Sequence, residues 1–181
     1  TFTYIRQKQM LGLGHAILTG ETLIGDETFA VLLADDLCYR ADHGVISQMI
    51  EIYNQYQCTV VAIHEVPINQ TNKYGIIAGN LIDNSNNIYQ VTDMIEKPEE
   101  GSAPSTMAII GRYILTPDIF NILKNIKPDK NGEIQITDAL LVQAKQGKVI
   151  AYKFKGRHFD CGSVTGYLEA TNFLANKKGI S

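Results

Sequence analysis

Residues 29–40 read FAVLLADDLCYR, an apolar run that ends on two acids. The run from Phe29 to Ala34 has the length and composition of a buried strand, and an unpaired carboxylate is costly to bury. In open α/β sheets, ligands bind beyond the carboxyl ends of the strands. Asp35 and Asp36 therefore mark a candidate ligand edge, where carboxylate oxygens suit a hard cation such as Mg²⁺. Taken alone, the dipeptide is explained more simply as a turn or helix cap with two solvated acids.

Short β-rich runs alternate with helical patterns along the chain, which is typical of a mainly parallel sheet with helices on its faces. We expect strands at residues 3–6, 28–34, 58–64, 88–95, 107–115 and 149–154. Two apolar faces at helical spacing predict helices, one through Val45, Met49, Ile52, Tyr53 and Tyr56 and the other through Ile119, Ile122, Leu123 and Ile126. Thr116 and Pro117 predict that the second helix begins near Asp118, with the threonine hydroxyl as its cap.

The composition excludes several classes of protein. The 181 residues, 45% hydrophobic and 19% charged, fit one α/β domain or most of a larger one. The net charge is -3 and the 16 lysines and arginines are scattered, so we expect no nucleic-acid partner. The apolar runs are far shorter than the roughly 20 residues that span a bilayer, so we expect no membrane partner. Cys38, Cys58 and Cys161 form no CxxC pair, which favours reduced thiols in the cytoplasm.

Several short motifs gain meaning from their order along the chain. They are QKQMLGLGHA at 7–16, LLADD at 32–36, KYG at 73–75, IEKP at 95–98, AIIGRYIL at 108–115, EIQITDA at 133–139 and FDCGS at 159–163. Together they closely resemble the bacterial UTP-glucose-1-phosphate uridylyltransferases, within the sugar-nucleotidyltransferase family, over essentially the whole chain. The resemblance implies an α/β fold of Rossmann-like type, with a mixed, mainly parallel sheet flanked by helices.

The resemblance implies a catalytic group made of two acids and one lysine. Asp35, directly after LLA, would be a Mg²⁺ ligand, and Asp160 of FDCG would be the second carboxylate ligand. Lys97 of EKP would neutralise the phosphate of glucose 1-phosphate. The implied reaction is in-line attack of the sugar phosphate on the α-phosphorus of UTP, which yields UDP-glucose and pyrophosphate. Because the nucleophile is already an anion, charge neutralisation matters and no general base is needed.

The resemblance also implies the residues that bind the two substrates. Gln7 and Gly12 would meet the edge of the uracil ring through a side-chain amide and a backbone group. Gly75 would offer its backbone to the sugar, because a residue without Cβ permits close approach. Glu96 would accept hydrogen bonds from the glucose hydroxyls. Ile109 would form a wall of the sugar pocket.

Other polar residues near these motifs are not assigned to the implied site. Asp36 is interpreted as a polar neighbour or a water-mediated contact, because relatives carry other residues there. Arg157 and His158 flank the second acid and are candidates for phosphate contacts. The polar residues of 133–138 are explained by a helix start. No metal-ligand spacing links the remaining histidines, which are His15, His43 and His64.

The family pattern begins with a strand and a glycine-rich loop, with a Thr-Arg pair, that binds the UTP phosphates, and no such loop is found here. We therefore expect residues 1–181 to be the C-terminal two-thirds of a single nucleotidyltransferase domain, without its N-terminal strands and phosphate loop. Such a chain would expose apolar sheet surface and would need a partner. We expect a homo-oligomer, and no turnover by residues 1–181 alone.

Alternative functions remain open at this point. A non-catalytic module that binds nucleotide sugars, or a regulatory module, would also lack the phosphate loop. A thymidylyltransferase of the same family would share most of the implied site. A glycosyltransferase that holds Mn²⁺ with an acidic pair is a weaker alternative, because it would not explain EKP, KYG and Gln7 together.

Overall fold

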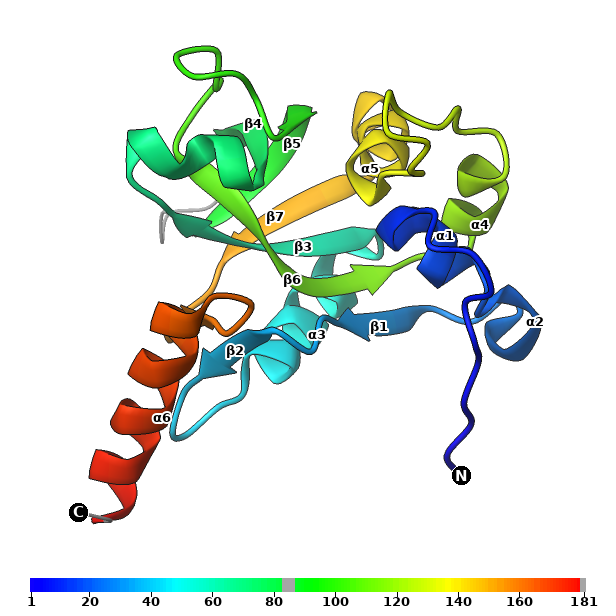
Figure 1. Ribbon diagram of the computed structural model, residues 1–181. Helices are drawn as coiled ribbons and strands as arrows, with labels where there is room; N and C mark the ends of the chain where they lie inside the picture. The colour runs from blue at the N-terminus through cyan, green and yellow to red at the C-terminus, as the bar shows by residue number, and fades with distance from the viewer. Residues whose placement is uncertain (83–86, 180–181) are drawn as a thin grey trace.

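The computed structural model describes residues 1–82 and 87–179, which form two sheets and the helices around them (Figure 1). The strands are β1 (Phe29–Leu32), β2 (Asp36–Tyr39), β3 (Thr59–Glu65), β4 (Gly75–Leu81), β5 (Ile88–Glu96), β6 (Met107–Leu115), β7 (Val149–Lys153) and β8 (Arg157–Asp160). The helices are α1 (Gly12–Leu18), α2 (Glu21–Ile24), α3 (Val45–Tyr56), α4 (Asp118–Leu123), α5 (Ile136–Lys145), α6 (Val164–Lys178) and the 3-10 helix η1 (Ile68–Lys73). Within the described residues, no helix is long and apolar enough to cross a bilayer.

The larger sheet has the strand order β1-β6-β3-β7-β5-β4, and β2 pairs with β8 in a separate ribbon. This mixed sheet with flanking helices confirms the predicted α/β class. Among the described strands, β3 and β7 form the parallel ladder and the other ladders are antiparallel. The parallel share is thus smaller than expected. The reason is that β5 and β6 both run opposite to β3, β4 and β7, so every ladder of the larger sheet that includes β5 or β6 is antiparallel.

Five of the six predicted strands are present, as β1, β3, β5, β6 and β7. The prediction for residues 3–6 is wrong: this segment lies outside both sheets, and Phe2 and Tyr4 are 94% and 93% exposed. Its β-branched and aromatic side chains do not pack against the rest of the protein, and strand formation depends on such packing. The pattern also missed β2, β4 and β8, because two are only four residues long and β4 carries two glycines.

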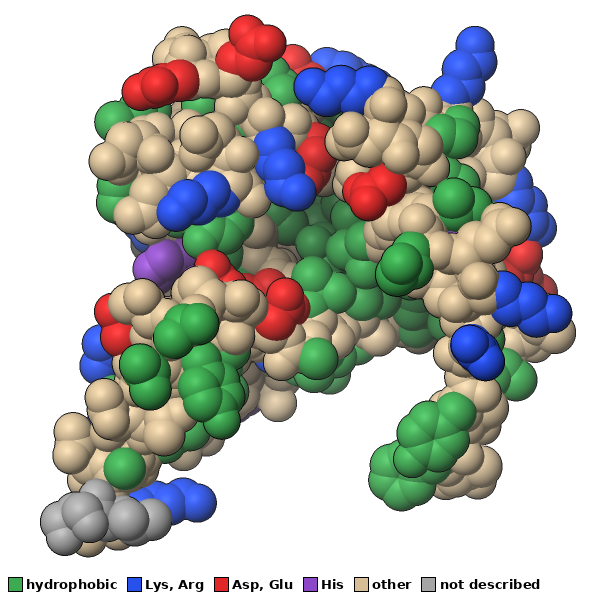
Figure 2. All heavy atoms as spheres, viewed as in Figure 1, with side chains coloured by type: hydrophobic (Ala, Val, Ile, Leu, Met, Phe, Trp, Pro, Cys, Tyr) green, Lys and Arg blue, Asp and Glu red, His purple; other side chains and the backbone are tan. Residues whose placement is uncertain are grey.

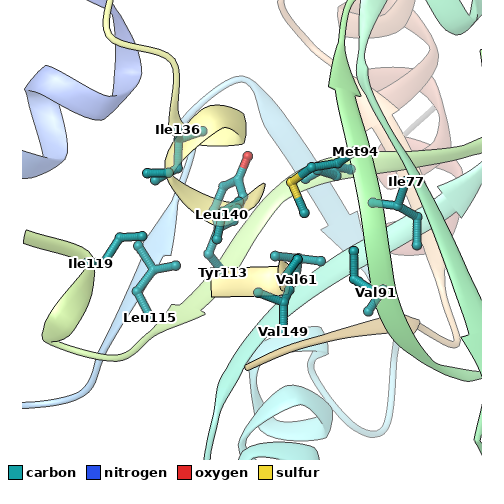
Figure 3. Close-up of a cluster of buried hydrophobic side chains, with 14 of the residues drawn as sticks. Val61, Ile77, Val91, Met94, Tyr113, Leu115, Ile119, Ile136, Leu140 and Val149 are labelled. Atoms are coloured by element: carbon teal, nitrogen blue, oxygen red, sulfur yellow. The ribbon is translucent and has the colours of Figure 1, made fainter. Parts of the chain in front are cut away.

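The core has two layers because alternate residues of a strand point to opposite faces of the sheet. On β3, Val61 and Ile63 join a cluster with α1, α4 and α5, whereas Val60 and Ala62 join a cluster with α3. Figure 3 shows the first cluster, in which Val61 and Leu140 lie between the sheet and α5. Burial on both faces fixes the central strands, and their ends can then carry polar residues.

Both predicted helices are present, as α3 and α4. Helix α4 begins at Asp118 as expected, but the predicted cap is wrong. The Thr116 hydroxyl lies 2.6 Å from Asp118 Oδ1, and the first-turn amide of Ile119 is bonded to the Thr116 carbonyl instead. The carboxylate accepts the hydroxyl proton because a charged acceptor is stronger than a neutral one.

Candidate active site

A cavity of about 480 Å³ opens at the ends of β5, β1 and β8. In the space-filling view, charged side chains of both signs border a hollow with an apolar floor (Figure 2). Seven of the eight predicted site residues line the cavity: Gly12, Asp35, Gly75, Glu96, Lys97, Ile109 and Asp160. The eighth, Gln7, lies outside the lining and contacts it through Gly12. The fold thus gathers residues that are spread over most of the chain.

Asp35 and Asp160 lie on neighbouring segments of the small ribbon. β2 and β8 pair antiparallel with Asp36 opposite Asp160, and the Cys161 amide donates to the Asp35 carbonyl at 2.7 Å. A Cβ placed on Gly162 would lie 3.1 Å from Asp160 Oδ1 and 3.2 Å from Asp35 Oδ2. Both carboxylates therefore face the space beside one glycine.

This pair of acids fits a hard divalent cation. Within residues 1–82 and 87–179, no group of three or more His, Cys, Asp or Glu side chains is placed to hold a metal. Mg²⁺ does not need such a group, because one or two carboxylates together with substrate phosphates and water complete its shell. Burial, followed by the charges of Asp160 and Asp36, raises the pKa of Tyr74 on the cavity wall. The charges of Asp160 and Asp36 thus make the potential at this wall more negative, which a cation would offset.

Asp36 differs from Asp35 in where its carboxylate is bonded. Asp36 Oδ2 accepts from the Gly111 amide at 3.0 Å, and Oδ1 is bonded to His158 Nε2. The side chains of Asp36 and His158 are only 17% and 8% exposed, so the pair is largely shielded from solvent. Arg112 adds a bond from its guanidinium to the Asp36 carbonyl. Asp36 therefore ties β2 to β6 and β8.

The two candidates for phosphate contacts are engaged elsewhere. His158 is bonded to Asp36. The Arg157 guanidinium lies over the rings of Phe159 and Phe173, 5.3 Å and 4.6 Å from their centroids. Neither residue lines the cavity. The structure therefore does not bring them to the proposed phosphate position.

Lys97 follows β5 in a left-handed backbone conformation, with φ of 43°. This region is unfavourable for a residue with a Cβ, so the position is strained. The Lys97 amide donates to the Tyr74 carbonyl at 3.0 Å, which anchors the turn beside β4. Within the described part of the chain, the Lys97 ammonium enters none of the ion pairs. The turn therefore places at the cavity wall an ammonium group that has no ion-pair partner among the described residues.

Glu96 lies opposite Gly75 in the β4–β5 ladder. The Thr137 hydroxyl donates to Glu96 Oε2 at 2.6 Å. A Cβ on Gly75 would lie 3.1 Å from Glu96 Oε2 and from Thr137 Oγ1, and 3.3 Å from Ile109 Cδ1. Any side chain at position 75 would thus fill the space between Glu96, Thr137 and Ile109. Thr137 of EIQITDA, which the sequence analysis explained by a helix start and left out of the site, thus lines the cavity.

Two contacts hold the side chain of Gln7 next to Gly12, which lines the cavity. Its Nε2 donates to the Gly12 carbonyl at 3.2 Å and lies 2.9 Å from His15 Nδ1. Helix α1, which carries His15, is fixed by Gly14, whose amide donates to the Ile134 carbonyl at 2.9 Å. The sequence offered no signal for His15 beyond its place in the LGLGHA motif.

The chain is similar in sequence to known proteins. A family model described as "Nucleotidyl transferase" matches residues 1–177. The UTP–glucose-1-phosphate uridylyltransferase of Pseudomonas aeruginosa is 61% identical over 174 residues, which are 96% of this chain and 62% of the relative. The chain thus spans less than two thirds of the length of that curated relative.

Two solved structures have a backbone fold similar to that of this chain. A UDP-glucose pyrophosphorylase complexed with UDP-glucose superposes with a TM-score of 0.93 at 59% identity, covering 97% of this chain and 66% of that chain. A UTP-bound UGPase from Acinetobacter baumannii superposes with a TM-score of 0.84 at 37% identity, covering 96% of this chain and 59% of that chain. Both likenesses extend over nearly all of the present residues.

Proposed function

Because the chain belongs to the nucleotidyl transferase family, we propose that the protein transfers a uridylyl group from UTP to glucose 1-phosphate. The products are UDP-glucose and pyrophosphate. The observation that carries the proposal is the single cavity in which Asp35, Asp160, Glu96 and Lys97 line one space. The relatives named above support the choice of nucleotide and sugar, since one solved relative holds UDP-glucose and another UTP.

Glu96 is assigned to the sugar hydroxyls. Its Oε2 already accepts a bond from Thr137, so the carboxylate keeps a defined orientation while its remaining lone pairs stay available. Gly75 lets a sugar ring approach the backbone of β4, because any larger residue would meet Glu96 and Thr137. Ile109, which is 7% exposed, supplies an apolar contact. These three residues would orient glucose 1-phosphate for attack.

Lys97 is assigned to the phosphate of the sugar. An oxygen of this phosphate attacks the α-phosphorus of UTP, a new P–O bond forms, and the bond to the β-phosphate oxygen breaks to release pyrophosphate. The attacking oxygen is an anion at neutral pH, so no proton has to be removed first. The ammonium of Lys97 offsets the repulsion between the two anions and stabilises the charge of the transition state.

Asp35 and Asp160 are assigned as ligands of Mg²⁺, which would supply charge neutralisation and orient the phosphate oxygens. Gln7 and Gly12 are assigned to the uracil edge. We also propose that residues 1–181 are part of one nucleotidyltransferase domain, which the match of the family model to residues 1–177 supports. A homo-oligomer and a cytoplasmic location remain predictions. The exposed apolar side chains of Val164, Tyr167 and Leu168 on α6 support the former.

The test uses a polypeptide of the full length of the curated relatives that carries residues 1–181 unchanged. Pyrophosphate release is measured with UTP, glucose 1-phosphate and Mg²⁺, and UDP-glucose binding is measured by calorimetry. Turnover that needs both substrates supports the proposal, and Lys97→Met serves as the inactive control. Binding of UDP-glucose without any turnover would instead favour a non-catalytic module.

A further inference from the structure

The amide of Gln7 has both of its N–H groups directed at other parts of the protein. A primary amide carries two N–H donors on nitrogen and two lone pairs on oxygen. Gln7 Nε2 lies 3.2 Å from the Gly12 carbonyl oxygen and 2.9 Å from His15 Nδ1. With both donors used, the oxygen Oε1 is the group of this amide that remains for a ligand.

The polarity of this arrangement is set by the Gly12 carbonyl. A carbonyl oxygen accepts hydrogen bonds and never donates, so the NH₂ of Gln7 and not its oxygen must face it. The second N–H then points at His15 Nδ1, which must accept. An Nδ1 that accepts this bond leaves the ring proton of His15 on Nε2. Reversal of the amide would set two acceptors against each other at Gly12.

We propose that His15 is a positioning residue that fixes Gln7 as a hydrogen-bond acceptor and thereby selects the nucleobase. This inference rests on the proposed function, in which Gln7 meets the pyrimidine edge. Uracil presents a donor at N3, which Gln7 Oε1 accepts. Cytosine presents a lone pair at N3, which Oε1 repels. Without the Nδ1 acceptor, the second N–H of the amide is free to donate to the ligand while the first still bonds the Gly12 carbonyl, and the repulsion of cytosine is relieved.

Two sets of variants isolate the acceptor at His15. His15→Leu and His15→Ala remove it, and His15→Asn keeps an acceptor oxygen near the position of Nδ1. They are compared in the full-length polypeptide by kcat/KM for UTP and for CTP, with KM and kcat measured separately. If the role of His15 were purely structural, its loss would lower kcat/KM for UTP and for CTP by the same factor. The ratio of the two kcat/KM values is therefore the decisive readout.

We expect His15→Leu and His15→Ala to lower the UTP to CTP ratio roughly fivefold, mainly through KM, since one hydrogen bond contributes about 1 kcal/mol. His15→Asn should restore most of the ratio. In a Gln7→Ala background, His15→Leu should leave the ratio unchanged, because the two residues act through one contact. This double-variant comparison also decides the matter if a single variant is unstable, as a melting curve would reveal.

The outcomes separate this inference from the proposed function. If the unsubstituted polypeptide has no UTP-dependent turnover, the proposed function fails. If it turns over UTP in preference to CTP and the His15→Leu and His15→Ala variants keep the same ratio, the positioning role of His15 is overturned. The positioning role would also be overturned if His15→Leu changed the UTP to CTP ratio equally in the presence of Gln7 and in the Gln7→Ala background.

Discussion

The hydroxyl of Thr137 donates to Glu96 Oε2 across 2.6 Å, and this bond joins the first turn of α5 to the end of β5. Thr137 is only 3% exposed. A hydrogen bond in such a shielded place, with a charged acceptor, is stronger than a neutral bond in water. The bond holds the carboxylate that we assign to the sugar hydroxyls in one orientation.

The first prediction concerns this bond. Thr137→Val removes the hydroxyl and keeps the shape of the side chain, so Glu96 should lose its fixed orientation. We expect KM for glucose 1-phosphate to rise roughly tenfold, because a hydrogen bond to a charged group contributes about 1.5 kcal/mol or more. KM for UTP should change little. Thr137→Ser keeps the hydroxyl and is the matched control. A rise in KM for UTP alone would contradict the assignment.

The second prediction separates the three acids of the small ribbon. Asp35→Asn and Asp160→Asn should weaken Mn²⁺ binding, measured by electron paramagnetic resonance with UTP present, because each removes one carboxylate from the shared space. Asp36→Asn should keep most of the Mn²⁺ affinity and instead lower the melting temperature, since it weakens the bonds to Gly111 and His158. Equal loss of Mn²⁺ affinity in all three folded variants would show that the acids are assigned wrongly.

The sequence was informative about this site where a residue follows a regular element. The run FAVLLA predicted β1, and its end predicted that Asp35 would lie at a ligand edge. Only the family resemblance brought Asp160 together with Asp35. The residue pattern alone could not, because the contact depends on the pairing of β2 with β8, two short strands 121 positions apart at Asp36 and Arg157. It also could not assign the partner of Asp36. His158 and Gly111 reach it only after three separate segments have packed together.

The third prediction tests the close packing of α1. A Cβ on Gly14 would lie 2.6 Å from the Ile134 carbonyl oxygen and 2.9 Å from Leu123 Cδ2. Gly14→Ala should therefore lower the free energy of unfolding by roughly 1–3 kcal/mol, the usual cost of overpacking. Gly44→Ala is the control, since its Cβ would meet its nearest neighbour, Ser47 Oγ, only at 3.9 Å. Urea unfolding measures both. A similar loss in the two variants would contradict the packing argument.

The fourth prediction concerns the pH dependence of stability. Burial, together with the charges of His158 and Lys153, lowers the pKa of His64 below its ordinary value of 6.5, while Glu65 acts in the opposite direction. The unfolded chain therefore binds a proton at His64 before the folded chain does. Stability should fall as the pH drops through about 6.5 and level off below the pKa of the folded state.

His64→Phe removes the imidazole that titrates and keeps an aromatic ring near Phe154. The ring centroids of His64 and Phe154 lie 5.8 Å apart. The variant should lose less stability than the unsubstituted protein between about pH 7.5 and about pH 5.5. Urea unfolding at both pH values gives the difference. An identical loss in the two proteins would mean that His64 titrates alike in the folded and unfolded chains.

The last prediction separates the chemistry of Lys97 from the strain of its backbone. Lys97→Ala and Lys97→Gly both remove the ammonium, so both should lower kcat/KM roughly 10²–10³-fold, the usual effect of losing one group that stabilises transition-state charge. Their stabilities should differ. With φ of 43° at this position, glycine adopts the conformation without a Cβ penalty and alanine does not. Lys97→Gly should therefore be more stable to urea than Lys97→Ala by about 1 kcal/mol. If Lys97→Ala were the more stable of the two, the left-handed turn would not be strained, and the lysine would need no support from the Tyr74 carbonyl to hold its place at the cavity.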